Sequence, residues 1–282
     1  MGNDKEWGMQ KEKSEATIKI ETIQGPNKNE LSFSPQRGGI IKSMKLNDVE
    51  ILYVDEKTFN DVNKNVRGGI PILFPNSGPL RSENNPYPEL KQHGFARNSN
   101  WISEHTGEKK FSEKLLSNDN TKKVFPYDFE MHMKGELKQD GSVVLSQEVT
   151  NSDRDREMPV SMGLHPYFKV PNEKKEYIKF NLSGGEKIEQ DFDNWSQGGT
   201  TSIDNPKVNK PEEILKIEIP ELGTLIIDAS VEYQKILIWS LPEHNFICIE
   251  PVMRNNDGLI DNPHIIKPNG TLSGKVIFRL ER

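Results

Sequence analysis

The clearest pattern along the chain is an alternation of apolar and polar residues with a period of two. Between residues 128 and 138, Phe129, Met131, Met133 and Leu137 take alternate positions, and charged or polar residues take most of the others. Side chains of a strand point alternately to its two faces, so this segment predicts a strand with one buried and one solvated face. Similar alternation recurs along the chain, and no segment has the apolar spacing of a long helix.

Turn residues separate these runs and predict how the strands are joined. Asp140-Gly141 lies between the first run and a second apolar run at residues 143–149, which predicts a β-hairpin. Residues 109–117 predict one or two helical turns at most.

Two segments predict long loops, residues 76–92 and residues 193–211. Loops of this length are uncommon in a compact β protein unless they carry function. Residues 1–14 are polar and predict a flexible N-terminus. The rest has no repeat and no break in composition. Residues 15–282 therefore predict one all-β domain of two large, packed antiparallel sheets.

Composition and charge narrow the class of protein. The 282 residues carry a net charge of -6, which argues against nucleic acid as a partner but allows a small phosphorylated ligand held by local cations. The single cysteine, Cys248, excludes an intramolecular disulfide and fits a reducing compartment. No secretion signal and no apolar stretch approaching ~18 residues is visible, so we expect a cytoplasmic protein without a membrane partner.

Three short segments each place an ionisable residue among glycines, prolines and aromatic residues. They are Arg67-Gly68-Gly69-Ile70-Pro71 continuing to His93-Gly94-Phe95-Ala96-Arg97, then Leu164-His165-Pro166-Tyr167-Phe168, then Ile249-Glu250-Pro251. Each alone has a structural explanation, such as a tight bend, a hydrogen-bonded core histidine or a surface carboxylate. No cluster has metal-ligand spacing, and Ser161 lacks the setting of a hydrolase nucleophile, so neither site is expected.

Together, and in this order, the three segments resemble the aldose 1-epimerase (galactose mutarotase-like) superfamily, and most closely its hexose-6-phosphate 1-epimerase-like branch. The run from Arg67 to Trp101 is similar to the first signature of that branch. The resemblance extends from about residue 15 to the C-terminus. It implies a β-supersandwich of two large antiparallel sheets, an open cleft for a sugar or sugar phosphate, and no metal or organic cofactor.

The resemblance also implies roles for individual residues. Glu250 would be the general base for the anomeric hydroxyl, His165 the general acid for the ring oxygen, and His93 a hydrogen-bonding group near that oxygen. These residue types suit the reaction, because ring opening deprotonates one oxygen while protonating another. A carboxylate at Glu250 is expected to favour the charged form of His165.

Further residues are candidates for binding the substrate. Arg67 and Arg97 suit a phosphate or sugar hydroxyls, because a guanidinium makes paired contacts with oxygen atoms. Asp204 matches an acidic residue that binds sugar hydroxyls in the family. Structural pairing of either arginine with a carboxylate, and a turn role for Asp204, remain alternatives. Three aromatic residues are candidates for the sugar's apolar face or for the core: Phe74, Tyr167 and Trp239.

Two other functions compete with an epimerase. A non-catalytic carbohydrate-binding protein would keep the cleft without the reaction. A sugar-active lyase or hydrolase has less support, because a glycosidase needs two carboxylates around the scissile bond and the segments supply one, Glu250.

Overall fold

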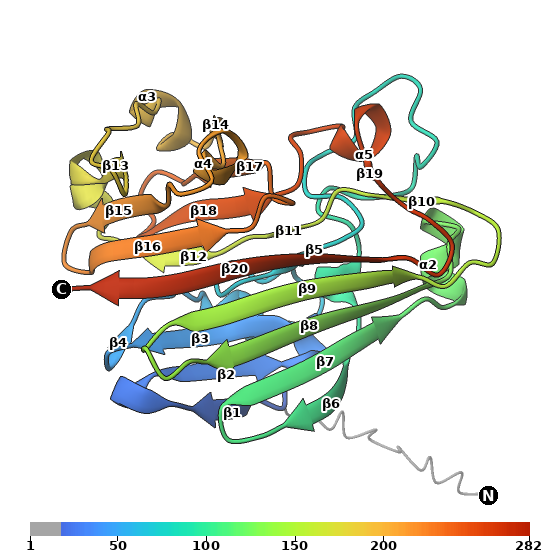
Figure 1. Ribbon diagram of the computed structural model, residues 1–282, viewed down its shortest axis with the longest axis horizontal. Helices are drawn as coiled ribbons and strands as arrows, with labels where there is room; N and C mark the ends of the chain where they lie inside the picture. Colours follow the sequence, from blue (N-terminus) through green and yellow to red (C-terminus); the bar gives the residue numbers. More distant parts are fainter. Residues whose placement is uncertain (1–17) are drawn as a thin grey trace, which may run out of the picture.

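The computed structural model describes residues 18–282, and most of its regular structure is antiparallel strand (Figure 1). This confirms the all-β prediction. The predicted flexible N-terminus, residues 1–14, lies outside the described residues. Within residues 18–282, none of the helices is long and apolar enough to cross a membrane.

An eight-stranded antiparallel sheet forms one layer of the fold. In spatial order its strands are β13 (Lys179–Leu182), β15 (Leu215–Ile219), β16 (Gly223–Ala229), β20 (Thr271–Glu281), β9 (Val143–Asn151), β8 (Phe129–Leu137), β7 (Lys110–Leu116) and β6 (Ile102–Thr106). The long β20 crosses the middle of Figure 1 beside β9, and β8 lies on the other side of β9. Strands β8 and β9 form the predicted hairpin, with Leu137 opposite Val143.

The second layer contains a six-stranded and a four-stranded sheet. The six-stranded sheet contains β14 (Thr200–Asp204), β17 (Lys235–Trp239), β18 (Phe246–Val252), β11 (Gly163–Leu164) and β5 (Ile72–Leu73), and β12 (Tyr167–Lys169) also pairs with β18. The four-stranded sheet contains β1 (Glu21–Gln24), β2 (Glu30–Ser34), β3 (Ile40–Leu46) and β4 (Val49–Glu50). Antiparallel bridges from Ile41 to Ile70 and from Leu52 to Phe168 join the two sheets.

The remaining elements are short. A two-stranded sheet pairs β10 (Met158–Val160) with β19 (His264–Ile266). The α-helices are α1 (Glu56–Asn60), α2 (Asp119–Val124), α3 (Phe192–Trp195), α4 (Pro206–Asn209) and α5 (Gly258–Asp261). The 3-10 helices are η1 (Pro26–Lys28), η2 (Pro35–Arg37), η3 (Ala96–Asn98) and η4 (Asn172–Tyr177).

The two loop predictions have different outcomes. Residues 76–92 form a loop, with only a bridge at Asn76, as predicted. Residues 193–211 were wrongly predicted as a loop, because they contain β14 and α4. Strand β14 is at the edge of its sheet and exposes polar residues such as Thr200 and Ser202, so its sequence lacks a clear apolar alternation.

Apolar side chains from the facing sheets fill the space between the layers. Phe33 on β2 stacks on Phe111 on β7, with ring centroids 3.9 Å apart. Phe168 on β12 lies 6.2 Å from Phe278 on β20. Such aromatic pairs stabilise a core by about 0.5–1.5 kcal/mol beyond the area they bury. These contacts confirm the predicted packing of large antiparallel sheets.

A buried hydrogen-bond chain connects the eight-stranded sheet to the strand that precedes His165. The Tyr233 hydroxyl donates to Gln147 Oε1 at 2.7 Å, and Gln147 Nε2 donates to the Gly163 carbonyl at 3.1 Å. Gln147 lies on β9 and Gly163 on β11. The chain therefore helps to fix β11 against the opposite layer.

The helical turn predicted at residues 109–117 is wrong, because residues 110–116 form strand β7. The apolar alternation is hidden by Glu113, which takes an inward position between Phe111 and Leu115. Glu113 is completely buried, and neither carboxyl oxygen has a hydrogen-bond partner among the described residues. Burial, with a smaller contribution from Glu21, raises the pKa of Glu113 well above its usual value.

We predict that Glu113→Gln removes a pH dependence of stability. A raised folded-state pKa contributes stability that is present below the unfolded-state pKa of about 4.3 and is lost as the pH rises toward the folded value. Between about pH 5 and about pH 8, the free energy of unfolding of the wild type should fall relative to Glu113→Gln, by up to about 1.4 kcal/mol per pH unit. Urea denaturation at both pH values measures this.

The exposed Glu108, two residues before β7, supplies a matched control. Glu108→Gln should follow the pH dependence of the wild type. Parallel stability curves for Glu113→Gln and the wild type would show that Glu113 ionises normally in the folded protein.

Candidate active site

A cleft of about 380 Å³ lies over the face of the six-stranded sheet that points away from the core. On β18, Ile247 and Ile249 face the core, whereas Glu250 has the opposite orientation and reaches the cleft. The lining residues are Ser77, Gly78, Pro79, Arg81, Gln92, His93, Arg97, His165, Tyr167, Gly198, Thr200, Leu237, Trp239, Glu250 and Asn256.

Strand register places His165 opposite Glu250. The pairings on both sides of His165 have the same register: Gly163 with Val252, and Tyr167 with Cys248. Two residues inward from either pairing, His165 is the partner of Glu250. Residues directly opposite each other on antiparallel strands share a face, so their side chains meet. His165 Nε2 is 3.3 Å from Glu250 Oε1.

The environment of this pair determines where its proton resides. His165 is 5% exposed and Glu250 is 3% exposed. Burial raises the pKa of Glu250 to about 8, partly offset by the charge of Arg97. Burial is the main cause that lowers the pKa of His165 well below its usual value, and the charge of Arg97, joined by that of His93 when it is protonated, lowers it further. At neutral pH the pair therefore holds one proton, on Glu250.

The expectation of a charged His165 is thus wrong for the protein without a ligand. Moving an ionised group out of water is unfavourable, and a contact with one partner compensates for this only in part. The neutral acid and the neutral imidazole avoid burying two charges.

The segment before η3 brings His93 next to His165. His93 has a positive φ of 69°, and Gly94 follows with a φ of 67°. A Cβ atom at Gly94 would lie 1.9 Å from the Phe74 carbonyl oxygen, so only glycine allows this close approach. The rings of His93 and His165 meet edge to face, with centroids 5.2 Å apart.

Hydrogen bonding indicates the tautomer of His93. Its Nδ1 contacts the Ser77 carbonyl oxygen, which can only accept a hydrogen bond. Burial and the charge of Arg97 lower the pKa of His93 to about 4, so the neutral ring carries its proton on Nδ1. Nε2, 3.1 Å from the Gln92 side-chain nitrogen, is then an acceptor. In this tautomer His93 Nε2 can accept a hydrogen bond from a ligand but cannot donate one.

Two aromatic residues form a wall around His165. The Tyr167 ring stacks on His165 with centroids 4.7 Å apart and an angle of 7° between the planes. Trp239 meets His165 edge-on at 6.1 Å, and its Nε1 donates to the Gly198 carbonyl. These contacts orient the imidazole and leave apolar surface at the cleft. Phe74, the third aromatic candidate, is completely buried and belongs to the core.

Of the two arginines predicted to bind substrate, only Arg97 lines the cleft. Its Nη2 makes a long, 3.4 Å hydrogen bond to the Gln92 carbonyl, and its buried Nε has no partner among the described residues. Arg97 therefore has donors available for a ligand. Arg67 does not line the cleft. Its Nη1 lies 3.1 Å from His244 Nε2 instead.

Asp204 is also outside the cleft lining. It lies at the end of β14, where its carboxylate pairs with Lys235 at 2.5 Å. Thr200, at the opposite end of the same strand, reaches the cleft. Asp204, which was predicted to bind sugar hydroxyls, therefore does not contact the cavity.

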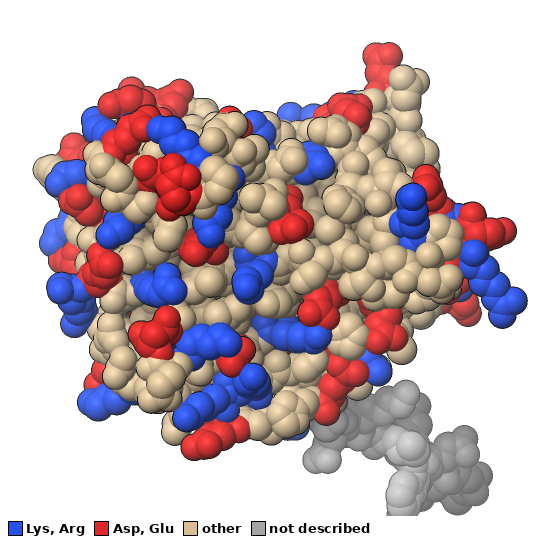
Figure 2. Space-filling view, viewed as in Figure 1, with Lys and Arg blue, Asp and Glu red and all other residues tan. Residues whose placement is uncertain are grey.

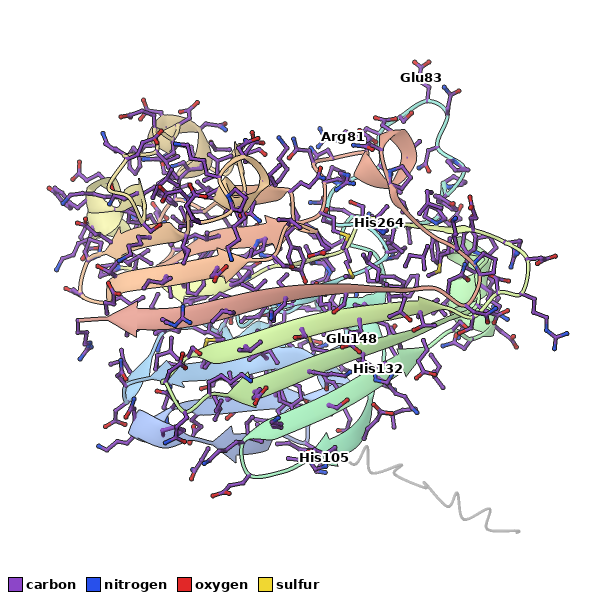
Figure 3. The ribbon with its side chains drawn as sticks, in the orientation of Figure 1. Arg81, Glu83, His105, His132, Glu148 and His264 are labelled. Atoms are coloured by element: carbon purple, nitrogen blue, oxygen red, sulfur yellow. The ribbon has the colours of Figure 1, made fainter. Side chains whose placement is uncertain are left out.

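Sequence reasoning missed Arg81, a second cation of the cleft. The backbone N–H groups of Arg81 and Ser82 both donate to the Asp257 carboxylate. Figure 3 shows Arg81 beside α5, which begins directly after Asp257. The only feature of the sequence that pointed to Arg81 was its place in the loop predicted at residues 76–92. Asp257, which holds this loop, is far away in the sequence, so no local motif marks Arg81.

The described residues also contain one group with the proximity of metal ligands. Each of His165, Cys248 and Glu250 offers one ligand atom, and these atoms lie within 4.8 Å of one another. Spacing in the sequence gave no sign of this group, because its members come from two separate segments.

Comparisons with known proteins agree with the fold and with the predicted family. The aldose 1-epimerase family profile matches residues 20–263. A protein of Cenchrus ciliaris, whose name proposes a glucose-6-phosphate 1-epimerase, is 23% identical over 273 residues, which cover 85% of this chain and 78% of that protein.

Solved structures share the architecture. A protein of Synechocystis sp. PCC 6803 is 27% identical, with a TM-score of 0.79 and coverage of 93% of this chain and 96% of that one. A galactose mutarotase related enzyme from Lactobacillus acidophilus is 20% identical, with a TM-score of 0.75 and coverage of 94% and 98%. Because the family profile spans most of the sequence, the chain belongs to the aldose 1-epimerase family.

Proposed function

We propose that the chain is an aldose 1-epimerase that interconverts the α and β anomers of an aldose. The observation that carries this proposal is the contact between His165 and Glu250 on the floor of the cleft. Both groups needed for proton transfer face the same cavity, and family membership gives the reaction class.

The proposed reaction uses two tautomers of the pair. With a cyclic sugar bound, the proton moves from Glu250 to His165. The Glu250 carboxylate then takes the proton of the anomeric hydroxyl while the His165 imidazolium protonates the ring oxygen, and the ring opens to the aldehyde. Rotation about the C1–C2 bond presents the other carbonyl face, and ring closure returns both protons. The two tautomers have the same net charge, so the cycle needs no proton from solvent.

We further propose a phosphorylated aldose as substrate. Among the residues that line the cleft, Arg81 and Arg97 are cationic, and Glu250 is the single acidic residue and is neutral when no ligand is bound. An excess of positive charge favours an anionic ligand, and guanidinium groups suit phosphate oxygens. This is the class that the name of the Cenchrus relative also proposes.

The alternative is a protein that binds sugars on this fold without catalysis. It would use the same cavity, wall and arginines. The difference lies in whether the His165–Glu250 pair transfers protons.

Magnetisation-exchange NMR on glucose, galactose and glucose 6-phosphate separates the two functions. We predict that the wild type accelerates anomer exchange for at least one of them. Glu250→Gln should reduce kcat/KM about 100- to 10,000-fold, because it removes the proton-transfer group and keeps the shape. Glu148→Gln, on the outer face of β9 (Figure 3), is a control that should retain activity. Full activity of Glu250→Gln would exclude the assigned base.

The pH profile of kcat/KM tests the shared proton. Above about pH 8 the pair loses its proton from Glu250, so activity should fall about tenfold per pH unit. Because the pKa of His165 lies well below 6.5, activity should stay constant as the pH drops from neutrality to that value. A decline that begins on lowering the pH from 7 would mean that the pair takes up a second proton near neutrality, which would contradict a single shared proton.

Arg81→Ala tests the phosphate. Loss of a charge-assisted hydrogen bond weakens binding by about 1.5–3 kcal/mol, which raises KM for the phosphorylated aldose roughly 10- to 100-fold. The free aldose should change much less. Arg67→Ala is the matched control and should show a smaller difference between the two substrates, since Arg67 does not line the cleft. Equal losses for both substrates in Arg81→Ala would contradict the phosphate role.

A further inference from the structure

Cys248 is a buried thiol that the proposed reaction does not use. It lies on β18 two residues before Glu250 and is completely buried. Residues two apart on a strand share a face, so Cys248 and Glu250 both point away from the core. Cys248 itself is not part of the cleft lining, whereas its neighbours His165 and Glu250 are.

The three side chains have the spacing of a partly formed metal site. Their ligand atoms all lie within 4.8 Å of one another. Tetrahedral zinc has bonds of about 2.0–2.3 Å, which put neighbouring ligand atoms roughly 3.3–3.8 Å apart. The distance from His165 Nε2 to Glu250 Oε1 is 3.3 Å. Small side-chain shifts therefore suffice to bring all three groups onto one ion.

The donor types select the kind of ion. A thiolate, an imidazole and a carboxylate are the ligands that zinc prefers, whereas magnesium and calcium prefer oxygen alone. Three protein ligands with the fourth position toward a cavity is the pattern of an open zinc site. Because His165 and Glu250 line the cleft, a fourth position on the ion would face it, and water or a substrate oxygen would complete the shell. The protons of the Cys248 thiol and of the Glu250 carboxyl group both leave to solvent when the ion binds.

We propose that His165, Cys248 and Glu250 form an inhibitory site for a thiophilic divalent cation such as Zn²⁺, which enters through the cleft and occupies both proton-transfer groups. The inhibitory consequence rests on the proposed function, but binding of the ion does not. Arg97 lies near the pair, and its charge opposes the ion. We therefore expect reversible inhibition and weaker affinity than that of a structural zinc site.

Cobalt absorption tests binding without any assay of activity. Co²⁺ bound to a thiolate gives a charge-transfer band, and a tetrahedral site gives strong visible bands. We predict that the wild type binds one Co²⁺ with both features and that Zn²⁺ displaces it. Cys248→Ser should lose the charge-transfer band. Cys248→Ala gives the same test if the serine variant folds poorly. No charge-transfer band in the wild type would overturn the proposal.

Inhibition of anomer exchange tests the consequence. Zn²⁺ should inhibit the wild type, and a chelator should restore its rate. Cys248→Ser should keep its rate without metal, yet need at least about tenfold more Zn²⁺ for half-inhibition, because it lacks the soft ligand. The same inhibition in both proteins would place the site elsewhere. If no aldose is a substrate, the cobalt spectrum still decides whether the ion binds.

A surface histidine provides the matched control. His132 lies on the outer face of β8 between Glu104 and Glu130, with contacts of 2.8 Å and 2.7 Å. It is another plausible zinc ligand, but it has no thiol. His132→Gln should leave the charge-transfer band and the inhibition unchanged, and a loss of either would contradict the assignment to Cys248.

Discussion

His165 and Glu250 meet in a setting almost closed to water, where neither side chain is stable in its charged form. One shared proton resolves this conflict, because a neutral acid beside a neutral imidazole buries no net charge. The surrounding groups reinforce this arrangement. Burial and the charge of Arg97 lower the pKa of His165, and Arg97 moderates the rise of the Glu250 pKa. In the proposed reaction, a bound sugar that accepts and donates hydrogen bonds shifts the proton between two states of equal charge.

The fold contributes rigidity to this contact. Strand β18 has apolar neighbours on its inner face and pairs with β17 on one side and with β11 and β12 on the other. His165 lies in the gap between β11 and β12, and the hydrogen bond from Gln147 to Gly163 fixes the start of that gap. On the opposite layer, positive and negative side chains are interspersed over the exposed face (Figure 2), so the excess of cations in the cleft is a local feature.

Much of the architecture could be predicted from the sequence, since strands such as β8 bury every second residue. The exception at β7 has a physical cause, because Glu113 interrupts the apolar row. The motifs led to His93, Arg97, His165 and Glu250, which line one cleft. Arg81 could not be predicted, because it reaches the cavity from an irregular loop held by the distant Asp257. The state of the shared proton could not be predicted either, since it depends on burial.

The most direct test is a crystal structure of Glu250→Gln with a bound aldose 6-phosphate. We expect the anomeric oxygen within hydrogen-bond distance of residue 250 and the ring oxygen within hydrogen-bond distance of His165. We also expect a sugar hydroxyl to donate to His93 Nε2 and the phosphate to lie beside Arg81 or Arg97. A sugar whose anomeric centre lies away from either member of the pair would show that the two groups do not act on one hemiacetal.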